Sequence, residues 1–307
     1  MSLSLPFAKG HGTENDFVIV PDPDGDLELT PGDVQRICER RAGIGADGLI
    51  RVVRTEAMVA AGELRASAAP AQAEWFMDYR NADGSVAEMC GNGVRVFAEY
   101  LLREGYLRER SARGGSGVPL ATRGGLKRVR LRTDGWWAVD MGEWDLPGGA
   151  QALERGFDAE VHLGGLDVSH PALSLDLGNP HTVVMLAENE DLDDVDLTRA
   201  PVVEPVPATG TNVEVLHTLE PEERDQVPVG RLRMRVHERG VGETRSCGTG
   251  ACAAAAAAAL WAGSLAPARW LIDVPGGQVE VRLGPGMRVE LAGPAVLVAD
   301  GYVSLDW

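Results

Sequence analysis

The chain has few cysteines, few positive charges and no long apolar segment, and each shortage excludes a class of protein. Its four cysteines among 307 residues are too few for a disulfide scaffold, and none forms a Cys-x-x-Cys pair that would indicate zinc. The formal net charge of −17 argues against nucleic acid or an anionic membrane as the partner. No apolar run approaches the roughly 20 residues of a membrane span, and the first residues lack the features of a signal peptide. We therefore expect a cytoplasmic protein with a small-molecule ligand.

Apart from these shortages, the length and composition are typical of a globular protein of about two domains. Hydrophobic residues make up 44% of the chain and charged residues 24%, which allows a sizeable core. Apolar and β-branched runs predict strands in several places. These strands are expected at residues 16–20, 48–53, 129–132, 182–186 and 279–283.

Helical signals are fewer. One helix is predicted to begin at Thr30-Pro31, an N-cap followed by a proline in the first turn, and to end at Gly43, with Cys38 in the core. The segments 54–74 and 109–118 show no clear period and are expected to be surface excursions. The acidic segment 188–196 is expected to be a solvated loop.

Two cysteines stand in nearly the same sequence environment, MCGNGVR at Cys90 and SCGTGAC at Cys247. Each cysteine precedes a glycine-containing turn and a predicted helix. The alanine run in the second of these helices, residues 253–259, indicates a helix enclosed by other structure. Cys252, on the same helix, is expected to be a small buried hydrophobe.

The similarity extends upstream of both cysteines. Asn81 lies nine residues before Cys90, and Glu238 lies nine residues before Cys247. Asn15 and Asn179 each stand just before an apolar strand. The offset of 157 residues between the two cysteines is about half of the chain, so the pattern favours a duplicated domain over a solenoid of short repeats.

Two thiols at helix N-termini have a specific chemical use. A helix N-terminus carries a partial positive charge and unpaired N–H donors, so it lowers the pKa of a thiol and binds a carboxylate. If the halves face each other, one thiol can remove a proton from a carbon and the other can return one from the opposite side. That reaction is racemisation or epimerisation.

A cofactor-free mechanism is favoured for this reaction. Pyridoxal phosphate requires a lysine, and the only two lysines, Lys9 and Lys127, stand in no phosphate-binding context. The glycines of the two motifs match neither a Walker nor a dinucleotide-binding pattern. Taken alone, either Cys-Gly pair is more typical of a packed cysteine in a turn, but two copies at matched spacing favour a functional role.

Several long motifs resemble those of the diaminopimelate epimerases, in the same order over nearly the whole chain. They are HGTENDF, NADGSVAEMCGNGVR, GNPH, TNVEV, ERGVGETRSCGTGACA and GPAVLVADG. The resemblance implies an α+β fold of two pseudo-symmetric domains, each a barrel-like mixed sheet around a central helix, with the active site between them. It implies one lobe of residues 1–140 and 294–307 with Cys90, and a second of residues 141–293 with Cys247.

By the same resemblance, Cys90 and Cys247 are the acid/base thiols that interconvert LL- and meso-diaminopimelate for lysine biosynthesis, without a cofactor or a metal. His181 and Glu238 would tune the pKa values of the thiols, and Arg239 would bind the distal carboxylate. The other substrate-binding residues implied are Asn15, Gly48, Asn81, Gly91, Asn92, Asn179, Asn212, Gly248 and Thr249.

The sequence departs from some relatives at two positions. Thr13-Glu14 stands where they have Leu-Gly, and Gly48 stands where they have a substrate-binding glutamine. A proline racemase or hydroxyproline epimerase is also compatible with two such thiols, although those proteins tend to carry histidine where this chain has Asn92. An isomerase like those of phenazine biosynthesis, which lacks one or both thiols, and a non-catalytic or redox protein are disfavoured but still open. A homodimer is expected, because two-fold dimers are the commonest assembly.

Overall fold

The computed structural model describes residues 4–304, and it divides into two compact units. Unit 1 comprises the described residues up to Asp140 together with those from Gly293 onward, and unit 2 is Met141–Ala292. Residues 1–3 and 305–307, which the sequence assigns to the first lobe, lie outside the described residues.

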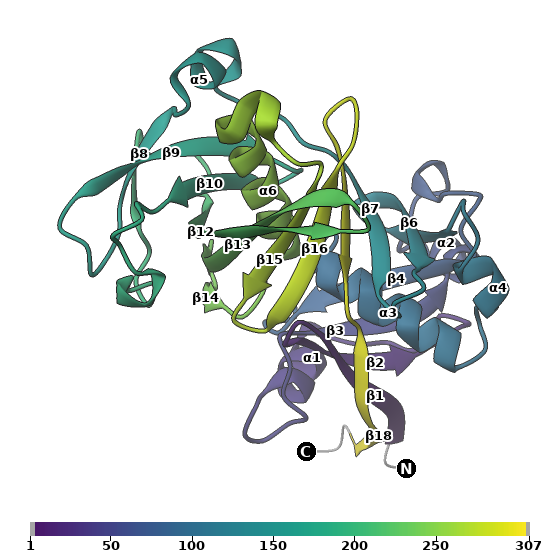
Figure 1. Cartoon of the computed structure of the whole chain (residues 1–307). Helices are drawn as coiled ribbons and strands as arrows, with labels where there is room; N and C mark the ends of the chain where they lie inside the picture. Colours follow the sequence, from purple (N-terminus) through teal and green to yellow (C-terminus); the bar gives the residue numbers. More distant parts are fainter. Residues whose placement is uncertain (1–3, 305–307) are drawn as a thin grey trace. The chain divides into compact units, whose positions relative to one another are not determined.

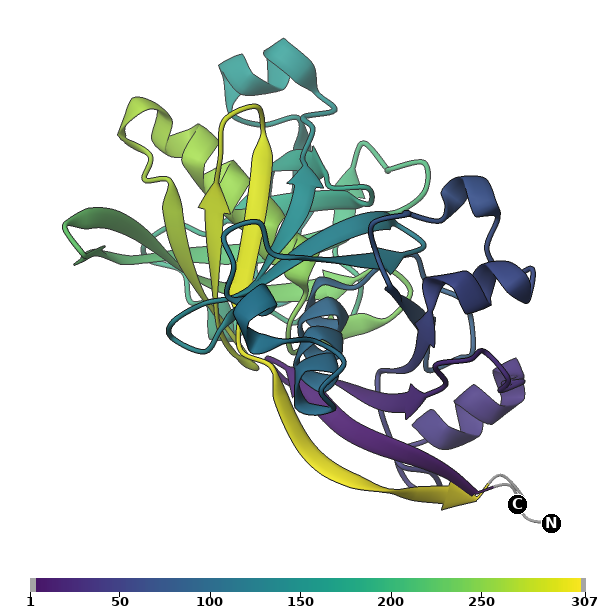
Figure 2. The ribbon, with the colours of Figure 1, turned by 90° about the vertical axis from the view of Figure 1, so that its right-hand side faces the viewer.

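The sheet of unit 1 combines antiparallel and parallel strand pairs (Figure 1). The pairs β18–β1, β1–β2, β3–β4, β5–β6 and β6–β7 are antiparallel, whereas β2–β3 and β4–β5 are parallel. The last strand of the chain thus pairs with the first, as the long β18 and β1 show in Figure 2. The strands are β1 (Ser4–Gly12), β2 (Asn15–Pro21), β3 (Gly48–Arg54), β4 (Trp75–Asn81), β5 (Val118–Thr122), β6 (Gly125–Leu131), β7 (Trp137–Glu143) and β18 (Val296–Ser304).

Unit 2 repeats this order of pairing. The pairs β10–β12 and β13–β15 are parallel, and β9–β10, β12–β13, β15–β16 and β16–β17 are antiparallel. Further antiparallel pairs join β8 to β9, β11 to β8, and β14 to β13. The strands are β8 (Ala159–His162), β9 (Ser169–Asp176), β10 (Pro180–Met185), β11 (Val202–Glu204), β12 (Asn212–Arg224), β13 (Val227–Glu238), β14 (Gly242–Thr244), β15 (Arg269–Val274), β16 (Gly277–Leu283) and β17 (Arg288–Gly293).

One long helix packs against the sheet of each unit. In unit 1 it is α3 (Gly91–Arg103), and in unit 2 it is α6 (Gly248–Ala262). The alanines of α6 from Ala253 to Ala258 are buried, because the strands of unit 2 lie close around the helix (Figure 1). The other helices are α1 (Pro31–Cys38), α2 (Thr55–Ala60), α4 (Glu109–Ala112), α5 (Gly149–Arg155) and the 3₁₀ turns Ala66–Ala68, Leu192–Asp194 and Gly263–Leu265.

Equivalent positions in the two units follow from the strand registers. Phe17 pairs with Gly48 across β2 and β3, and His181 pairs with Asn212 across β10 and β12. Counting along the strands from these pairs, Ile50 in unit 1 corresponds to Glu214 in unit 2.

Three local expectations need correction. The helix that begins at Thr30-Pro31 ends at Cys38 and not at Gly43, because the Glu39 carboxylate accepts the Arg41 and Ala42 N–H groups and turns the chain. The segments 54–74 and 109–118 contain the short helices α2 and α4. The stretch 248–265 is long and apolar enough to cross a membrane, contrary to expectation, but 56% of it is buried as the core helix of its unit.

Candidate active site

Cys90 is the N-cap of α3, and its surroundings form the Cys90 cluster, which we define as Asn15, Cys90 and Asn92. The Gly93 N–H donates to Cys90 Sγ over 3.4 Å. Cys90 Sγ donates in turn to Asn15 Oδ1 at 3.5 Å, and Asn92 Nδ2 donates to the same oxygen at 3.2 Å. The cluster therefore presents an acceptor oxygen to the Cys90 thiol.

The Asn15 side chain is held from its other end as well. Its Nδ2 donates to Asp47 Oδ2 at 2.7 Å, which leaves Oδ1 directed toward Cys90. Asn15 begins β2 directly after a two-residue turn, Thr13-Glu14, in which both residues have positive φ, 51° and 61°. Such a turn normally carries Asn-Gly, so the backbone is strained here. The buried Arg95 contacts this turn, with its Nη2 donating to Thr13 Oγ1 at 3.3 Å.

Gly48 and Asn81 face each other at the ends of β3 and β4. Asn81 Nδ2 donates to Ser85 Oγ at 3.0 Å. A Cβ atom on Gly48 would lie 2.6 Å from the Arg80 carbonyl oxygen and 2.6 Å from Tyr79 Cε2. A side chain at position 48 would therefore require its neighbours to shift, and Gly48 itself offers only its backbone for binding.

Cys247 is the N-cap of α6, with the same backbone geometry as Cys90. The Gly250 N–H donates to Cys247 Sγ over 3.4 Å, and Thr249 Oγ1 lies 3.5 Å from that sulfur. We define the Cys247 cluster as Cys247, Thr249, Asn179, His181 and Glu214. Only 7% of Cys247 is exposed, whereas Cys90 is half-buried.

The inner part of the Cys247 cluster is a buried polar chain. Asn179 Nδ2 donates to Thr249 Oγ1 at 3.5 Å, and Asn179 Oδ1 lies 3.1 Å from His181 Nε2. His181 Nδ1 lies 2.7 Å from Glu214 Oε1, and both of these side chains are fully buried. In unit 1 the equivalent positions hold the buried, apolar Phe17 and Ile50.

Glu238, Asn212 and Arg239 lie at neighbouring strand ends in unit 2. Thr244 Oγ1 donates to Glu238 Oε1. Asn212 Oδ1 accepts from the Arg239 N–H at 2.9 Å, and its Nδ2 donates to the Pro180 carbonyl at 3.1 Å. Arg239 is exposed, and its Nη1 donates to the Thr209 carbonyl at 2.7 Å.

Burial decides the protonation of the thiol in the Cys247 cluster. It raises the pKa of Cys247 well above the usual range, and the charges of Glu238 and Glu214 raise it further. Hydrogen bonds from Thr249 and the Gly250 N–H act in the opposite direction. The helix N-terminus alone predicted a lowered pKa for this thiol, and that prediction is wrong because desolvation is the larger effect.

The carboxyl group of Glu238 is affected in the same direction. Burial raises its pKa, and hydrogen bonds from Thr244 and Cys247 oppose that rise. A carboxylate with a raised pKa that is hydrogen-bonded to a thiol is a suitable acceptor for the proton of that thiol.

Sequence reasoning missed several members of these clusters. Glu214 lies in the TNVEV motif, and a charged residue within an apolar strand was the signal that could have revealed it. Asp47, Thr244 and Ser85 each hold a predicted site residue in place, and their sequence neighbourhoods give no comparable signal.

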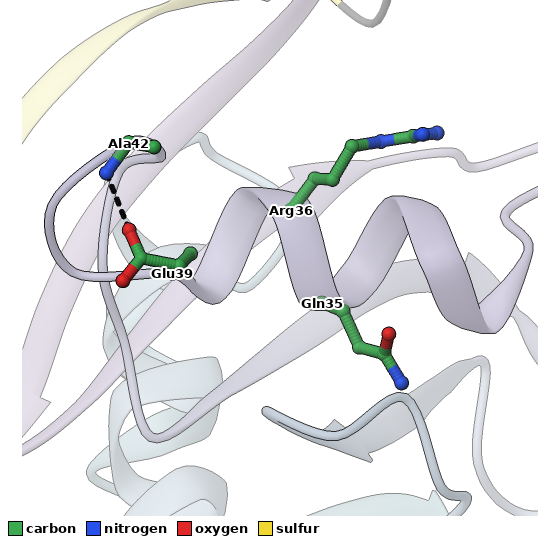
Figure 3. Close-up of a pocket in the computed structure, with 4 residues that line it drawn as sticks. All are labelled: Gln35, Arg36, Glu39 and Ala42. Atoms are coloured by element: carbon green, nitrogen blue, oxygen red, sulfur yellow. Dashed lines mark hydrogen bonds between the residues drawn. The ribbon is translucent and has the colours of Figure 1, made fainter.

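A surface pocket of about 350 Å³ lies beside α1, away from these clusters in sequence. Figure 3 shows its lining, in which the Glu39 carboxylate accepts the Ala42 N–H. The pocket is lined by Gln35, Arg36, Glu39 and Ala42. None of the four belongs to the Cys90 or the Cys247 cluster, so the pocket has no part in the site.

Solved structures first define the class of fold. A Bacillus anthracis phenazine biosynthesis protein of the PhzF family matches with a TM-score of 0.63 at 17% identity, covering 98% of this chain and 99% of that protein. A hydroxyproline epimerase from Agrobacterium vitis, with bound trans-4-hydroxy-L-proline, matches with a TM-score of 0.61 at 15% identity over 99% and 93%. The α+β fold expected from the sequence is confirmed: the chain has the fold shared by these two proteins.

Sequence comparison identifies the family within this class. The diaminopimelate epimerase family model matches residues 7–146 and 173–298. A diaminopimelate epimerase of Streptomyces coelicolor is 46% identical, covering 100% of this chain and 98% of the relative. Another, of Thermobifida fusca, is 48% identical over 98% and 99%. The chain belongs to the diaminopimelate epimerase family.

Proposed function

We propose that this protein interconverts LL- and meso-2,6-diaminopimelate by a two-base mechanism in which Cys90 and Cys247 are the acid/base groups. Membership of the family supports the substrate and the reaction, an isomerisation in lysine biosynthesis. The single observation that supports the mechanism is the repeated geometry, in which each cysteine is the N-cap of the long helix of its unit and accepts an N–H from the helix.

In the proposed step, one thiolate removes the α-hydrogen as a proton, and the opposite thiol donates its proton to the other face of the carbon. The products are the inverted stereoisomer, a thiol where the thiolate was, and a thiolate where the thiol was. The N–H groups in the first turns of α3 and α6, at Gly91-Asn92 and Gly248-Thr249, bind the carboxylate at the reacting centre and stabilise the developing negative charge. Loss of one such donor typically costs about 2.7–4 kcal/mol in other enzymes.

Glu238 makes the thiolate of Cys247 accessible despite burial. The Cys247 proton passes along its hydrogen bond to the Glu238 carboxylate, and the remaining thiolate accepts from the Gly250 N–H and the Thr249 hydroxyl. Burial raises the pKa of both groups, so the thiol and the carboxyl group hold one proton between them. Moving that proton from Cys247 to Glu238 costs less free energy than ionising the buried thiol with no acceptor beside it.

The remaining polar residues bind the rest of the substrate. Asn15, Asn81, Asn179 and Asn212 hold ammonium and carboxylate groups, and Arg239 forms a bidentate pair with the distal carboxylate. Within residues 4–304 the exposed Arg239 guanidinium pairs with a backbone carbonyl and with no carboxylate, so the substrate can recruit it without breaking an ion pair. Gly48 contributes through its backbone only.

The wider setting follows from the same proposal. The two units are the epimerase lobes with Cys90 and Cys247, and the reaction needs neither pyridoxal phosphate nor a metal. The partner is a small molecule and not nucleic acid, in keeping with the net charge of −17. We propose a cytoplasmic location and a homodimer.

Deuterium incorporation tests the mechanism. In heavy water, a two-base enzyme delivers a solvent-derived deuteron to the product, while recovered substrate at low conversion carries much less label. Equal labelling of substrate and product would contradict the two-base assignment. Parallel assays with LL-diaminopimelate and L-proline separate the proposed substrate from that of a proline racemase, and a redox protein would change the optical rotation of neither.

A further inference from the structure

Two charged side chains hold the amide groups of the Cys90 cluster from outside it. One is Arg95 on α3, whose Nη2 donates to Asn92 Oδ1 at 2.9 Å. The other is Asp47, directly before β3, whose Oδ2 accepts from Asn15 Nδ2 at 2.7 Å. Between them, Asn92 Nδ2 donates to Asn15 Oδ1 at 3.2 Å. The four side chains thus form one chain of hydrogen bonds that runs past the Cys90 sulfur.

The partner of Asn92 fixes the orientation of its amide group. A guanidinium group stays protonated and only donates hydrogen bonds, so the atom of Asn92 that faces Arg95 must be the oxygen. Exchange of the two amide atoms would set two N–H donors against each other at 2.9 Å. The nitrogen of the Asn92 amide therefore faces Asn15.

Asp47 fixes the orientation of Asn15 in the same way. Its Oδ2 also accepts from the backbone N–H of Asp16 at 3.1 Å, and its Oδ1 accepts from Arg40 Nη2 at 2.6 Å. Both carboxylate oxygens are acceptors, so the atom of Asn15 that faces Asp47 must be the nitrogen. Asn15 Oδ1 is therefore left facing the Cys90 sulfur, 3.5 Å away.

The two anchors, which we define as Arg95 and Asp47, act on different amides and agree with each other. Arg95 turns a donor of Asn92 toward Asn15, and Asp47 turns an acceptor of Asn15 toward Asn92. Each anchor suffices alone, because the amide that it fixes orients the other amide through the 3.2 Å hydrogen bond between them. Reversal of the chain therefore requires the loss of both anchors.

We propose that Arg95 and Asp47 are positioning residues that hold Asn15 Oδ1 toward the Cys90 sulfur, so that Cys90 faces a hydrogen-bond acceptor. An acceptor at this place binds the S–H of a thiol, whereas a thiolate requires a donor there. Asn15 would offer that donor only if its amide turned. The inference deepens the proposed function and rests on it, because it concerns the protonation of one of the two proposed acid/base groups.

Packing keeps Arg95 in its place. The side chain is 0% exposed, and its Nη2 donates to Thr13 Oγ1 at 3.3 Å as well as to Asn92. A Cβ atom on Gly12, the last residue of β1, would lie 2.9 Å from Arg95 Nη2, so glycine leaves the space that the guanidinium group occupies. One nitrogen of Arg95 thus joins the strained turn before β2 to the first turn of α3.

Unit 2 has no equivalent of either anchor. Counting from the N-cap cysteines and along the strand registers, the positions of Arg95 and Asp47 hold Cys252 and Thr211 there. The amide group of Asn179 contacts a hydroxyl group and an imidazole ring, each of which can donate or accept. Charged partners therefore fix the direction of the amide in unit 1 and not in unit 2.

The other charged groups around Asp47 pair among themselves. Asp16 on β2 pairs with Lys9 on β1 at 2.6 Å and with Arg40 at 2.8 Å, and Arg40 also pairs with Asp47 at 2.6 Å. Within residues 4–304 the Asp16 carboxylate forms no hydrogen bond with the Asn15 amide group. Asp16 therefore offers a control for the effect of a neighbouring charge without the hydrogen bond.

The test is the rate of alkylation of Cys90 by iodoacetamide as a function of pH, followed by peptide mass spectrometry. Alkylation reports the thiolate, so its pH midpoint is measured without any need for epimerase activity. In the double variant Asp47→Ala/Arg95→Met both amides can turn, and Asn15 Nδ2 donates to the thiolate. We expect the midpoint to fall by about one pH unit, which speeds alkylation about tenfold below it. Each single variant should move it much less, because the remaining anchor holds the chain.

The pattern of the shifts separates direction from charge. If the anchors acted only through their charges, Asp47→Ala would lower the midpoint, Arg95→Met would raise it, and the double variant would lie between the two. If they acted only in packing, no midpoint would move. Either result overturns the proposal. The matched control is Asp16→Asn/Arg95→Met, which removes a neighbouring carboxylate in place of Asp47 and should not reproduce the fall.

Conservative replacement gives a further check. Lysine at position 95 keeps a charged donor for Asn92, so Asp47→Ala/Arg95→Lys should bring the midpoint back to that of Asp47→Ala alone. A midpoint as low as that of Asp47→Ala/Arg95→Met would show that the donor is not what matters.

A second route covers the case in which variants of the buried Arg95 do not fold. Asp47→Ala/Asn92→Ala leaves Arg95 in place and still frees Asn15, so it should lower the Cys90 midpoint by about as much. In the wild type, the infrared S–H stretching band that is lost in Cys90→Ser should move to higher frequency in Asn15→Leu, because the thiol loses its acceptor. An unmoved midpoint or band would refute the proposal. Wild-type turnover of LL-diaminopimelate is measured in parallel, so a failure of the proposed function is recognised separately.

Discussion

The two units place different chemistry on the same backbone. Beneath the helix turn of Cys90 lie Phe17 and Ile50, and a Cβ atom on Gly93 would lie 3.5 Å from an atom of each. Beneath the turn of Cys247, the equivalent positions hold His181 and Glu214. The backbone gives the two cysteines the same hydrogen bond, because each Sγ accepts from an N–H group of its helix at a distance of 3.4 Å between nitrogen and sulfur.

The difference shows how a duplicated fold can carry out an asymmetric reaction. In the proposed two-base mechanism, proton removal on one face and delivery on the other require the two sulfurs to differ in protonation at any moment. A symmetric pair of sites would give both cysteines the same preference. Buried side chains can break that symmetry without altering the helix turns that are proposed to bind the substrate carboxylate.

Replacing either cysteine tests whether both are needed and should have the largest effect. Cys90→Ser and Cys247→Ser should each lower epimerisation by about 10² to 10⁴-fold, because an alcohol is a far weaker acid than a thiol and cannot supply the base. The measurement is the conversion of LL-diaminopimelate to the meso form. Cys38→Ser and Cys252→Ser, both at buried sites outside the two clusters, should leave turnover largely intact. Near wild-type activity of Cys247→Ser would show that the Cys247 thiol is not an acid/base group, and the comparison between the two cysteines would then have no basis.

Giving unit 2 the apolar residues of unit 1 tests the asymmetry directly. The double variant His181→Phe/Glu214→Ile should lower turnover about tenfold, the factor of one pKa unit, because it removes the buried polar side chains behind Asn179 and Thr249. Its free energy of unfolding should stay the same or rise by about 1–4 kcal/mol, since apolar residues often replace a buried pair of polar or charged side chains without loss. Turnover and denaturant unfolding measure the two effects. A variant that loses stability and activity together would show that the pair is structural.

Gly48 in unit 1 and Asn212 in unit 2 occupy equivalent positions at the start of a strand, so the same substitution can be compared at both. Gly48→Gln introduces the residue found in some relatives, but its Cβ would meet the Arg80 carbonyl oxygen at 2.6 Å. We expect a loss of about 1–3 kcal/mol in the free energy of unfolding, as is usual for overpacking. The equivalent change in unit 2, Asn212→Gln, adds one methylene where a side chain already stands and should cost less. Equal costs would mean that position 48 is not constrained by packing.

The strained turn of unit 1 should give the smallest effect. Glu14 has a φ of 61°, which favours glycine, so Glu14→Gly should increase the free energy of unfolding by about 1 kcal/mol. Asn179, which follows Gly178 with a φ of 89°, marks the equivalent place in unit 2, where glycine already relieves the strain. Thermal unfolding of the variant is the measurement, and an unchanged or lower stability would show that the Glu14 side chain contributes more than its backbone costs.

Much of the site could be read from the sequence because it is built from local signals. The N-cap positions of Cys90 and Cys247 follow from glycine-containing turns that open helices, and the alanine run correctly indicated an enclosed helix. The predicted strands at 16–20, 48–53 and 279–283 lie within β2, β3 and β16. The family could be recognised because its motifs are long and in register.

Other features depend on contacts that a local pattern does not show. The sequence predicted a helix as far as Gly43, but the Glu39 side chain ends it at Cys38 through hydrogen bonds with the following N–H groups. Arg95 reaches the Thr13-Glu14 turn across a separation of 82 residues.

The sequence by itself determined where the two cysteines stand and what each helix turn offers them, because caps and turns depend on a few neighbouring residues. Only the tertiary structure decided what lies beneath those turns. Strand register brings His181 and Glu214 together across 33 residues, and it brings Phe17 and Ile50 together in the same way. Burial then makes the difference chemically important, since polar side chains away from water must form hydrogen bonds with one another, whereas apolar side chains only pack.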